Sequence, residues 1–413
     1  MQSTLLVIGF VYPEPNSSAA GSRMLQLIKA FQAQNYNVVF ATSCKKSDNA
    51  FDLESIGVCV VEIELNHSSF DVFISELKPT AVLFDRFMSE EQFGWRVAEH
   101  CPNALRILDT EDLHFLRKAR QKALNTNQPL ENALFSDDNT KREIASIYRS
   151  DVSLIISEYE FELLTHTFKI DPSILMYLPF MLDSNDCEPR LDCRTYSERN
   201  DFASIGNFLH APNLEAVHYL KKEVWPQIHK ALPEAKLHIY GAYDTPKVRA
   251  LHNEKDGFLV HGFVKDGYDV LNSAKVLLAP LRFGAGLKGK LIQAMQTGTP
   301  CAMSSIAAEG MFGSLPPNGF FTDDPKLFVK QAIELYLNQS QWEACQNQGF
   351  SILKNRFDKL QHQSALHSRI ESLTKNRSQH RTQNFIGQML NHHLMQSTKY
   401  MARWIEAKNK TID

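Results

Sequence analysis

The sequence predicts an α/β fold made of two Rossmann-like parallel-sheet domains that face each other across a cleft, with a helical C-terminal extension. Short apolar runs typical of buried strands alternate with amphipathic helical segments from residue 5 to residue 305. A polar stretch over residues 182–201 interrupts this alternation once. The repeated order of strand, helix and strand predicts right-handed crossovers and a parallel sheet covered on both faces.

Composition and charge exclude several classes of protein. The 413 residues are 43% hydrophobic and 22% charged, which suits two or three globular domains. A net charge of -3 gives no reason to expect a nucleic-acid partner. No apolar run reaches the roughly 18 residues of a membrane-spanning helix, and the N-terminal run lacks the basic flank of a signal peptide. Seven cysteines without CxxC spacing indicate free thiols, so we expect a cytoplasmic protein.

The first domain is predicted to cover residues 1–180. Its apolar runs are short, bounded by turn residues and separated by amphipathic segments. The predicted strands are residues 5–9, 38–42, 58–63, 81–85, 106–109 and 153–157. The clearest predicted helices between them are residues 22–34, 89–100 and 141–150.

The second domain is predicted to cover residues 181–375, beginning with the linker at 182–201. Its predicted strands are residues 201–206, 236–241, 257–262, 275–280 and 300–305. Three of these strands end in glycine, at Gly206, Gly241 and Gly262. Flexible turns therefore lie at the carboxyl edge of the sheet, where open α/β sheets bind ligands.

Residues 376–413 form a separate basic tail with an approximate apolar stripe. The stripe comprises Phe385, Ile386, Met389, Leu390, Leu394, Met401, Trp404 and Ile405. The tail cations are Arg377, Arg381, Lys399, Arg403, Lys408 and Lys410, against the acids Glu406 and Asp413. Such a helix predicts peripheral contact with the inner face of a membrane or with a partner. The alternative is that the stripe packs on the protein's own body.

The stretch at residues 280–300 predicts an anion site, because a buried strand leads through a glycine loop into a helix. Gly284 and Gly286 allow a ligand to approach the backbone closely. Lys288 and Lys290 place two cations at the first helical turn, where amide N–H groups lack helical partners. This combination favours a diphosphate. The GxxxxGK pattern of a P-loop, followed by Ser or Thr, is absent.

Five segments of the second domain occur in the order typical of one enzyme class. They are residues 206–213, 225–241, 260–266, 280–300 and 307–310. The domain resembles the nucleotide-binding half of GT-B glycosyltransferases, particularly the retaining family 4. Residues 12–31 and 149–164 of the first domain resemble that family more loosely. The resemblance implies a nucleoside-diphosphate sugar as donor, no other cofactor, no catalytic metal, and a glycan, lipid-linked or protein acceptor.

The resemblance also implies roles for individual residues. Lys288 and Lys290 would neutralise the donor diphosphate, and Lys290 would assist its departure. Further implied donor-binding residues are Gly21, Ser22, Gly206, Asn213, Gly262, Phe263, Val264, Gly284, Gly286, Gln293 and Glu309. Gln293 departs from the family, which usually has a glutamate there to accept hydrogen bonds from the ribose, whereas glutamine offers one carbonyl acceptor. We therefore expect weaker donor binding or an unusual sugar nucleotide.

Residues 109–117 form the densest polar cluster that follows a predicted strand. Asp112 and His114 are our predicted catalytic residues, because a carboxylate or histidine can orient an acceptor hydroxyl. The alternative for both is a helix N-cap with charges that are favourable to the helix dipole. Asp85 and Arg86 form a second candidate pair, with a simple ion pair at a strand end as the alternative. No metal is expected, since no DxD triplet is present.

These observations predict a glycosyltransferase that moves a hexose-type sugar from a nucleoside-diphosphate sugar to an acceptor hydroxyl, with retention implied by the family alone. Two rivals use the same fold. A nucleotide-sugar-binding or regulatory protein with weakened catalysis is suggested by Gln293. An epimerase that acts on the sugar nucleotide itself would need no acceptor. His210 follows the first strand of the second domain and is a further candidate donor contact.

Overall fold

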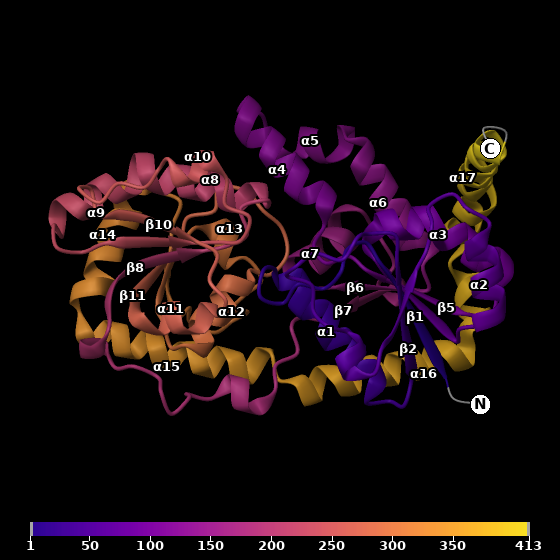
Figure 1. The fold of residues 1–413 in the computed structure, drawn as a ribbon, viewed down its shortest axis with the longest axis horizontal. Coiled ribbons are helices and arrows are strands. Elements are labelled where there is room, and N and C mark those ends of the chain that lie inside the picture. Colours follow the sequence, from indigo (N-terminus) through magenta and orange to yellow (C-terminus); the bar gives the residue numbers. More distant parts are fainter. Residues whose placement is uncertain (1–2, 411–413) are drawn as a thin grey trace.

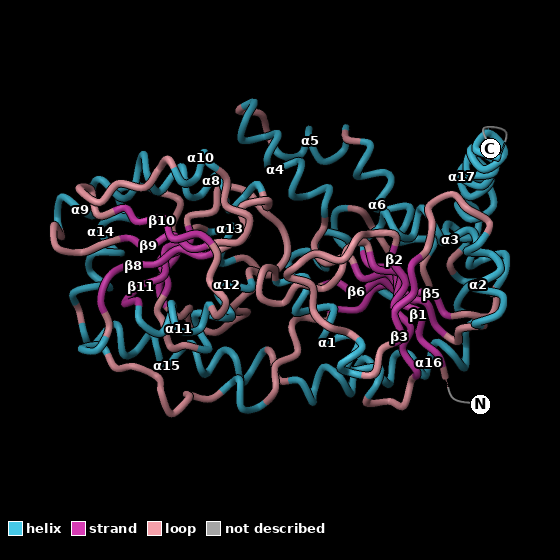
Figure 2. The backbone as a smooth tube through the Cα atoms, viewed as in Figure 1, coloured by secondary structure: helices cyan, strands magenta, loops and turns pink. Residues whose placement is uncertain are grey.

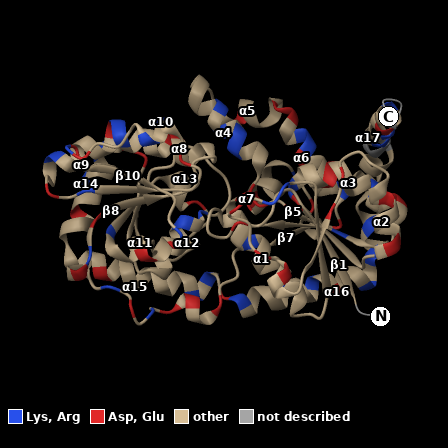
Figure 3. Ribbon diagram, in the orientation of Figure 1, with Lys and Arg blue, Asp and Glu red and all other residues tan. Residues whose placement is uncertain are grey.

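The computed structural model describes residues 3–410, whose strands form two separate parallel β-sheets with helices on both sides of each (Figures 1 and 2). The two predicted Rossmann-like domains and the helical C-terminal extension are therefore confirmed. Charges of both signs are spread over both domains (Figure 3), and their total numbers nearly balance.

The first sheet has seven strands in the order β3-β2-β1-β4-β5-β6-β7. Its strands are β1 (Thr4–Gly9), β2 (Asn37–Thr42), β3 (Cys59–Glu62), β4 (Ala81–Asp85), β5 (Leu105–Asp109), β6 (Val152–Ile155) and β7 (Leu175–Tyr177). The central strand β1 is buried on both faces, which explains why its sequence is continuously apolar rather than alternating. The six predicted strands are present, and β7 was not predicted because three residues show no periodicity.

The second sheet has six strands in the order β10-β9-β8-β11-β12-β13. Its strands are β8 (Asn200–Ile205), β9 (Leu237–Tyr240), β10 (Phe258–Gly262), β11 (Ala274–Ala279), β12 (Cys301–Met303) and β13 (Gly319–Phe321). All five predicted strands are found. Strand β13 was missed for the same reason as β7, because it too has only three residues.

Helices connect the strands of both sheets. Those of the first domain are α1 (Ala19–Gln32), α2 (Ser69–Leu77), α3 (Arg86–His100), α4 (His114–Thr126), α5 (Leu130–Ser136), α6 (Asp138–Arg149) and α7 (Glu158–Glu162). Those of the second are α8 (Ala211–Tyr219), α9 (Trp225–Ala231), α10 (Pro246–Arg249), α11 (Gly267–Ser273), α12 (Gly289–Gln296), α13 (Ser305–Ala308), α14 (Pro325–Leu337) and α15 (Gln339–Arg356). Two long helices follow, α16 (Lys359–Gln383) and α17 (Phe385–Lys410).

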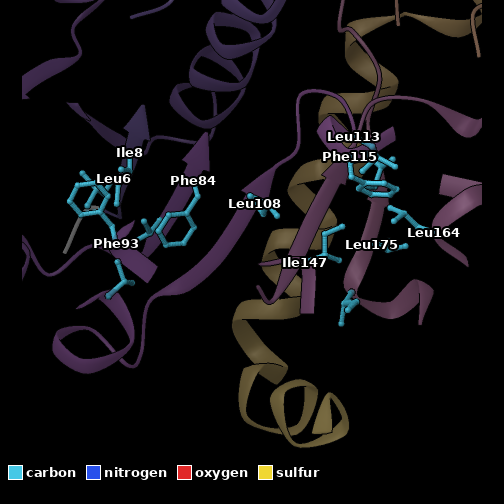
Figure 4. Close-up of a cluster of buried hydrophobic side chains, with 14 of the residues drawn as sticks. Leu6, Ile8, Phe84, Phe93, Leu108, Leu113, Phe115, Ile147, Leu164 and Leu175 are labelled. Carbon is cyan, nitrogen blue, oxygen red and sulfur yellow. The ribbon is translucent and has the colours of Figure 1, made fainter. Parts of the chain in front are cut away.

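Alternation along β1 builds two cores, one on each face of the first sheet. Leu6 and Ile8 belong to one buried cluster, and Leu5 and Val7 to the other. Figure 4 shows the first cluster, in which side chains from neighbouring strands are joined by others from the loop and helix that follow β5. Burial of this kind contributes roughly 25 cal/mol per Å² of apolar surface removed from water.

The chain crosses between the domains twice, once in the linker at Leu182 and once at the junction of α15 and α16, and the two crossings lie side by side. Leu182, in the linker, accepts a hydrogen bond from Lys359 N at 2.9 Å and donates one to Phe357 O at 2.8 Å. The outgoing linker and the junction of α15 and α16 therefore share backbone hydrogen bonds. Paired crossings of this kind can act as a hinge, since a few residues at element ends absorb a domain rotation.

The tail returns to the first domain. Helix α16 runs from the crossing along the first domain to α17, which stands at the far end of the molecule against α3 and α6 (Figure 1). The guanidinium of Arg381 binds the buried carboxylate of Asp151 through Nε and Nη2, both at 2.7 Å. Lys399 and Arg403 pair with Glu99, and Glu406 pairs with Arg96. The tail therefore packs on the protein's own body, as the second interpretation predicted.

Part of the predicted apolar stripe stays at the surface of α17. Its exposed members are Phe385, Ile386, Met389, Met401 and Trp404. The side chains of Leu394 and Lys410, and all of Asp413, lie outside the described residues. Asn376, at the predicted start of the tail, is a point of non-helical backbone inside α16 (φ -109°, ψ 16°). Between residues 3 and 410, no helix has both the length and the apolar character needed to cross a membrane.

Replacement of Arg381 by methionine should destabilise the protein. Asp151 is 2% exposed, and the variant leaves its carboxylate without its bidentate partner. Loss of one member of a largely buried ion pair costs about 2–4 kcal/mol, which urea unfolding followed by circular dichroism would measure. Arg377→Met is the control, because Arg377 contacts only exposed Asn103 atoms, and should cost under about 1 kcal/mol. Equal losses in the two variants would contradict this role for Arg381.

Candidate active site

A cleft of about 1390 Å³ lies between the two domains, at the carboxyl ends of both sets of parallel strands. Its walls come from the loops after β1, β4 and β5 in the first domain and from those after β8, β9, β10 and β11 in the second. Parallel sheets bind ligands at this edge, because helix N-termini and loops converge there. The volume suits a ligand larger than a single sugar.

The glycine loop between β11 and α12 forms one wall of the cleft. Lys288 is the N-cap of α12 and donates from Nζ to Ala285 O at 3.1 Å and to Gly286 O at 2.5 Å. Lys290 Nζ donates to Asn213 Oδ1 at 2.8 Å. Gly286 has φ +65°, and a Cβ there would lie 2.8 Å from Cβ of Asp112. Only glycine allows this loop to approach the first domain so closely.

Both lysines are held in the cleft without a carboxylate partner among the described residues. Burial lowers the pKa of Lys288 to about 8. Burial and the neighbouring Lys288 lower the pKa of Lys290 to about 7. A bound diphosphate would supply the missing charge and raise both values. The electrostatics of the loop therefore favour an anion, as its sequence predicted.

The structure brings most of the predicted donor-binding residues to the cleft wall. Those that line it are Ser22, Gly206, Asn213, Phe263, Val264, Gly284, Lys288, Lys290 and Gln293. His210, the further candidate donor contact, lines it as well, and burial followed by nearby Arg117 lowers its pKa to about 4. Gln293 is exposed into this space from the same helix as Lys290.

Four predicted residues are not among the described residues that line the cleft: Gly21, Gly262, Gly286 and Glu309. Gly21 instead allows α1 to pack on its preceding loop, since a Cβ there would lie 2.4 Å from the backbone of Glu14. Glu309 lies in a bidentate ion pair with Arg120 of the first domain, with N–O distances of 2.9 and 2.6 Å. The sequence placed Glu309 facing the donor, but its carboxylate is engaged at the interface between the domains.

Asp112, His114 and Arg117 line the opposite wall. Asp112 accepts a hydrogen bond from the Arg117 guanidinium, and His114 Nε2 lies 3.4 Å from Asp112 Oδ1. Helix α4 begins at His114 with Leu113 as its N-cap and without a side-chain cap. Asp112 is therefore not the N-cap of α4. Its Oδ2 is bound by Arg117, and its buried Oδ1 has no hydrogen-bond partner in the described chain.

Burial and neighbouring charges set the protonation states of Asp112 and His114. Burial alone would raise the pKa of Asp112, but Arg117, His114 and His210 lower it below its ordinary value. Burial lowers the pKa of His114 to about 3, with Arg117 adding to this and Asp112 opposing it. At neutral pH, Asp112 is a carboxylate and His114 is a neutral ring. Both can accept a hydrogen bond, but neither is a strong base.

Arg86 and Glu111 lie beside this pair with strained backbones. They follow β4 and β5 and have φ values of +68° and +62°, which are uncommon for residues with a Cβ. Both side chains line the cleft, and burial together with Asp109 and Asp85 raises the pKa of Glu111 well above its usual range. Arg86 Nε lies 3.5 Å from Asp85 Oδ1, so the predicted pair is present. Strain of this kind is concentrated at functional sites.

Three interdomain contacts at the cleft were not predicted. Tyr243 OH, after β9, donates to the carboxylate of Glu14 from the first domain at 2.9 Å. Arg120 donates to Gly284 O at 2.8 Å, and Gly286 N donates to the carboxylate of Glu160 at 2.8 Å. Each partner lies more than a hundred residues away, so no local pattern identifies it. Among the side chains that the structure describes, no group of three or more from His, Cys, Asp or Glu could hold a metal ion.

The half-buried cation at position 290 should lower the stability of the protein without ligand. Unfolding returns the pKa of this lysine from about 7 to its ordinary value, so the cost is fully present below pH 7 and fades as the pH rises toward 10.5. Lys290→Met should therefore raise the thermal unfolding midpoint by about 2–6 °C at pH 6.5, and by less at pH 9.5.

The control for this experiment is Lys236→Met, since Lys236 is an exposed lysine of the same domain. Its midpoint should stay within about 1 °C of the parent at both pH values. A Lys290→Met variant that unfolds at a lower temperature than the parent at pH 6.5 would contradict the cost assigned to this cation.

One protein-family model matches part of the second domain. Residues 199–338 match the family described as glycosyl transferases, group 1. This region contains the glycine loop, both lysines and Gln293. A search of curated proteins finds no significant match.

Solved structures with the same fold cover the whole two-domain arrangement. Sucrose-phosphate synthase from Thermosynechococcus elongatus has a TM-score of 0.69 at 15% identity, over 90% of this chain and 99% of its own. HepE from Anabaena, in complex with UDP and glucose, has a TM-score of 0.67 at 11% identity, over 90% and 100%. The pneumococcal O-GlcNAc transferase GtfA, in complex with UDP and GlcNAc, has a TM-score of 0.67 at 12% identity, over 90% and 99%.

The predicted GT-B architecture is thus confirmed, and the family match together with this fold supports glycosyltransferase activity. Identities of this size establish the fold rather than the substrates. The chain has the two-domain GT-B fold, and its second domain matches the group 1 glycosyl transferases.

Proposed function

We propose that this protein transfers a hexose-type sugar from a nucleoside-diphosphate sugar to an acceptor hydroxyl. One observation carries the proposal. Lys288 and Lys290 stand at the N-terminus of α12, without carboxylate partners in the described chain, and face Asp112 and His114 across the cleft. Paired cations and oriented amides stabilise the charge that develops on a departing diphosphate, while the opposite wall can position an acceptor.

The proton chemistry of the site favours transfer with retention. The acceptor hydroxyl must lose a proton as its oxygen bonds to the sugar and the sugar–phosphate bond breaks. Asp112 and His114 are weak bases, since the pKa of Asp112 is below its ordinary value and that of His114 is about 3. We propose that they orient the hydroxyl and that the departing phosphate oxygen takes its proton. The acceptor then attacks from the face that the phosphate leaves, which preserves the anomeric configuration.

We also propose a donor class, an acceptor class and a location for the protein. UDP is present in the HepE and GtfA structures, so uracil nucleotides are the first donors to test. We propose that catalysis needs no metal and no further cofactor, because the two lysines and the helix N-terminus supply positive charge at the diphosphate. A glycan, lipid-linked or protein acceptor is proposed, as is a cytoplasmic location with peripheral contact to the inner membrane face through α17.

Replacement of Lys290 by alanine tests the proposed reaction. A thermal-shift panel of nucleotide sugars first identifies the donor, since a ligand that binds the folded state stabilises it. With that donor, Lys290→Ala should lower kcat/KM about 10²- to 10³-fold, because the leaving diphosphate loses a cation. The unfolding midpoint without ligand should not fall. Unchanged transfer and donor hydrolysis in this variant would overturn the assignment of Lys290.

Gln293 favours a second candidate, a nucleotide-sugar-binding or regulatory protein on the same fold. The side chain lies in the cleft on α12, where it can still reach the nucleotide. It lacks the carboxylate that the resemblance leads us to expect. Loss of one charge-assisted hydrogen bond costs roughly 1.5–3 kcal/mol, which weakens donor binding without preventing it.

Gln293→Glu separates the two candidates. A glutamate that accepts hydrogen bonds from the ribose should raise donor affinity or kcat/KM about 10- to 100-fold. Gln296→Glu is the matched control, because Gln296 also lines the cleft from α12, one turn further on, and should give no comparable gain. Isothermal titration and a transfer assay measure both quantities. Donor binding without turnover in the parent and in both variants would favour the binding protein.

A further inference from the structure

The backbone of the glycine loop at residues 284–286 is fixed by side chains of the opposite domain. We propose that Glu160 is a positioning residue that holds this donor loop and the acceptor loop of Asp112 and His114 in one fixed relation. The inference rests on the proposed function and extends it, because it identifies how the two halves of the cleft are aligned for transfer.

One carboxylate oxygen of Glu160 makes both contacts. Oε1 accepts from Leu113 N at 3.0 Å and from Gly286 N at 2.8 Å. Leu113 lies between the two predicted catalytic residues of the first domain, and Gly286 lies two residues before Lys288. A single atom thus joins the two loops that carry the proposed chemistry, although they are about 170 residues apart in the chain.

The environment of Glu160 excludes a role at the surface. Its side chain is fully buried, and Oε2 has no hydrogen-bond partner among the described residues. Glu160 also stands three residues after Ser157, the N-cap of α7, a spacing typical of a capping box. No side-chain cap is formed there, so its carboxylate serves the two loops instead of its own helix.

Arg120 secures the other side of the same loop. From α4 it donates to Gly284 O at 2.8 Å and binds Glu309 through two further hydrogen bonds. A carbonyl and an amide of the donor loop, two residues apart, are therefore both engaged by the first domain. Because these contacts cross between the domains, a rotation that opens the cleft would break them and release the loop.

Loss of the Glu160 contacts should disturb the alignment of donor and acceptor more than it weakens donor binding. The two lysines and the start of α12 belong wholly to the second domain, so they can hold a diphosphate whether or not Glu160 is present. The relation between the diphosphate and the acceptor loop depends on Oε1. A displacement of about 1 Å between reacting groups can cost about 100-fold in rate.

Two variants of Glu160 and one control separate the positioning role of this side chain from an effect of its charge. Glu160→Gln keeps the carbonyl oxygen that accepts both N–H groups. Glu160→Asp keeps the carboxylate but is one methylene shorter and cannot reach both loops. Glu162→Ala, on the same short helix, is the control, since Glu162 is exposed. We expect kcat to fall about 10- to 100-fold in Glu160→Asp and by less than about fivefold in Glu160→Gln, with donor KM within about threefold throughout.

Hydrogen exchange followed by mass spectrometry gives a second readout that needs no turnover. In Glu160→Asp, peptides covering residues 110–118 and 281–290 should exchange faster together, while the rest of the protein and the control variant remain unchanged. Faster exchange in only one of these segments would overturn the proposal, as would equal loss of kcat in the Asp and Gln variants. A parent protein without transferase activity would refute the proposed function, whereas the exchange result would still decide whether Glu160 joins the loops.

Discussion

The shape of the donor loop depends on contacts from the other side of the cleft. Its strand and helix belong to the second sheet, yet Gly286 has room for no side chain because Asp112 lies against it. Its flanking carbonyl and amide are bound by Arg120 and Glu160. The site is therefore complete only while the two domains are together, and the chain crosses between them at the paired segments near Leu182.

Neutral oxygen atoms surround the two neighbouring cations of the cleft. Lys288 satisfies its ammonium with carbonyls of its own loop, and Lys290 with the amide oxygen of Asn213. Neutral acceptors of this kind replace water but do not balance the charge, so burial lowers both pKa values. An anionic ligand balances it. The two cations lower the stability of the protein without ligand. A bound diphosphate removes this cost, and the free energy so recovered strengthens its binding.

The fold was predictable because its signals are local. Parallel strands buried on both faces appear as continuous apolar runs, and eleven of the thirteen strands were identified from such runs. The missed strands β7 and β13 have three residues each, and neighbouring strands rather than local periodicity place them at sheet edges. The packing of α17 on the first domain involves long-range pairs such as Lys399 with Glu99, which no pattern within the tail could show.

The parts of the site that lie within one continuous segment of the sequence could be predicted, and the contacts between distant segments could not. The glycine loop and its lysines form one continuous segment, Asp112 and His114 form another, and the structure places both segments at the cleft. The resemblance implied that Glu309 binds the donor, whereas in the structure its carboxylate is bound by Arg120 of the other domain. Glu160 carries a pattern typical of a helix cap. A glutamate that matches a capping box but leaves the cap unmade is free to bridge two loops, and only the relative position of the domains shows which ones.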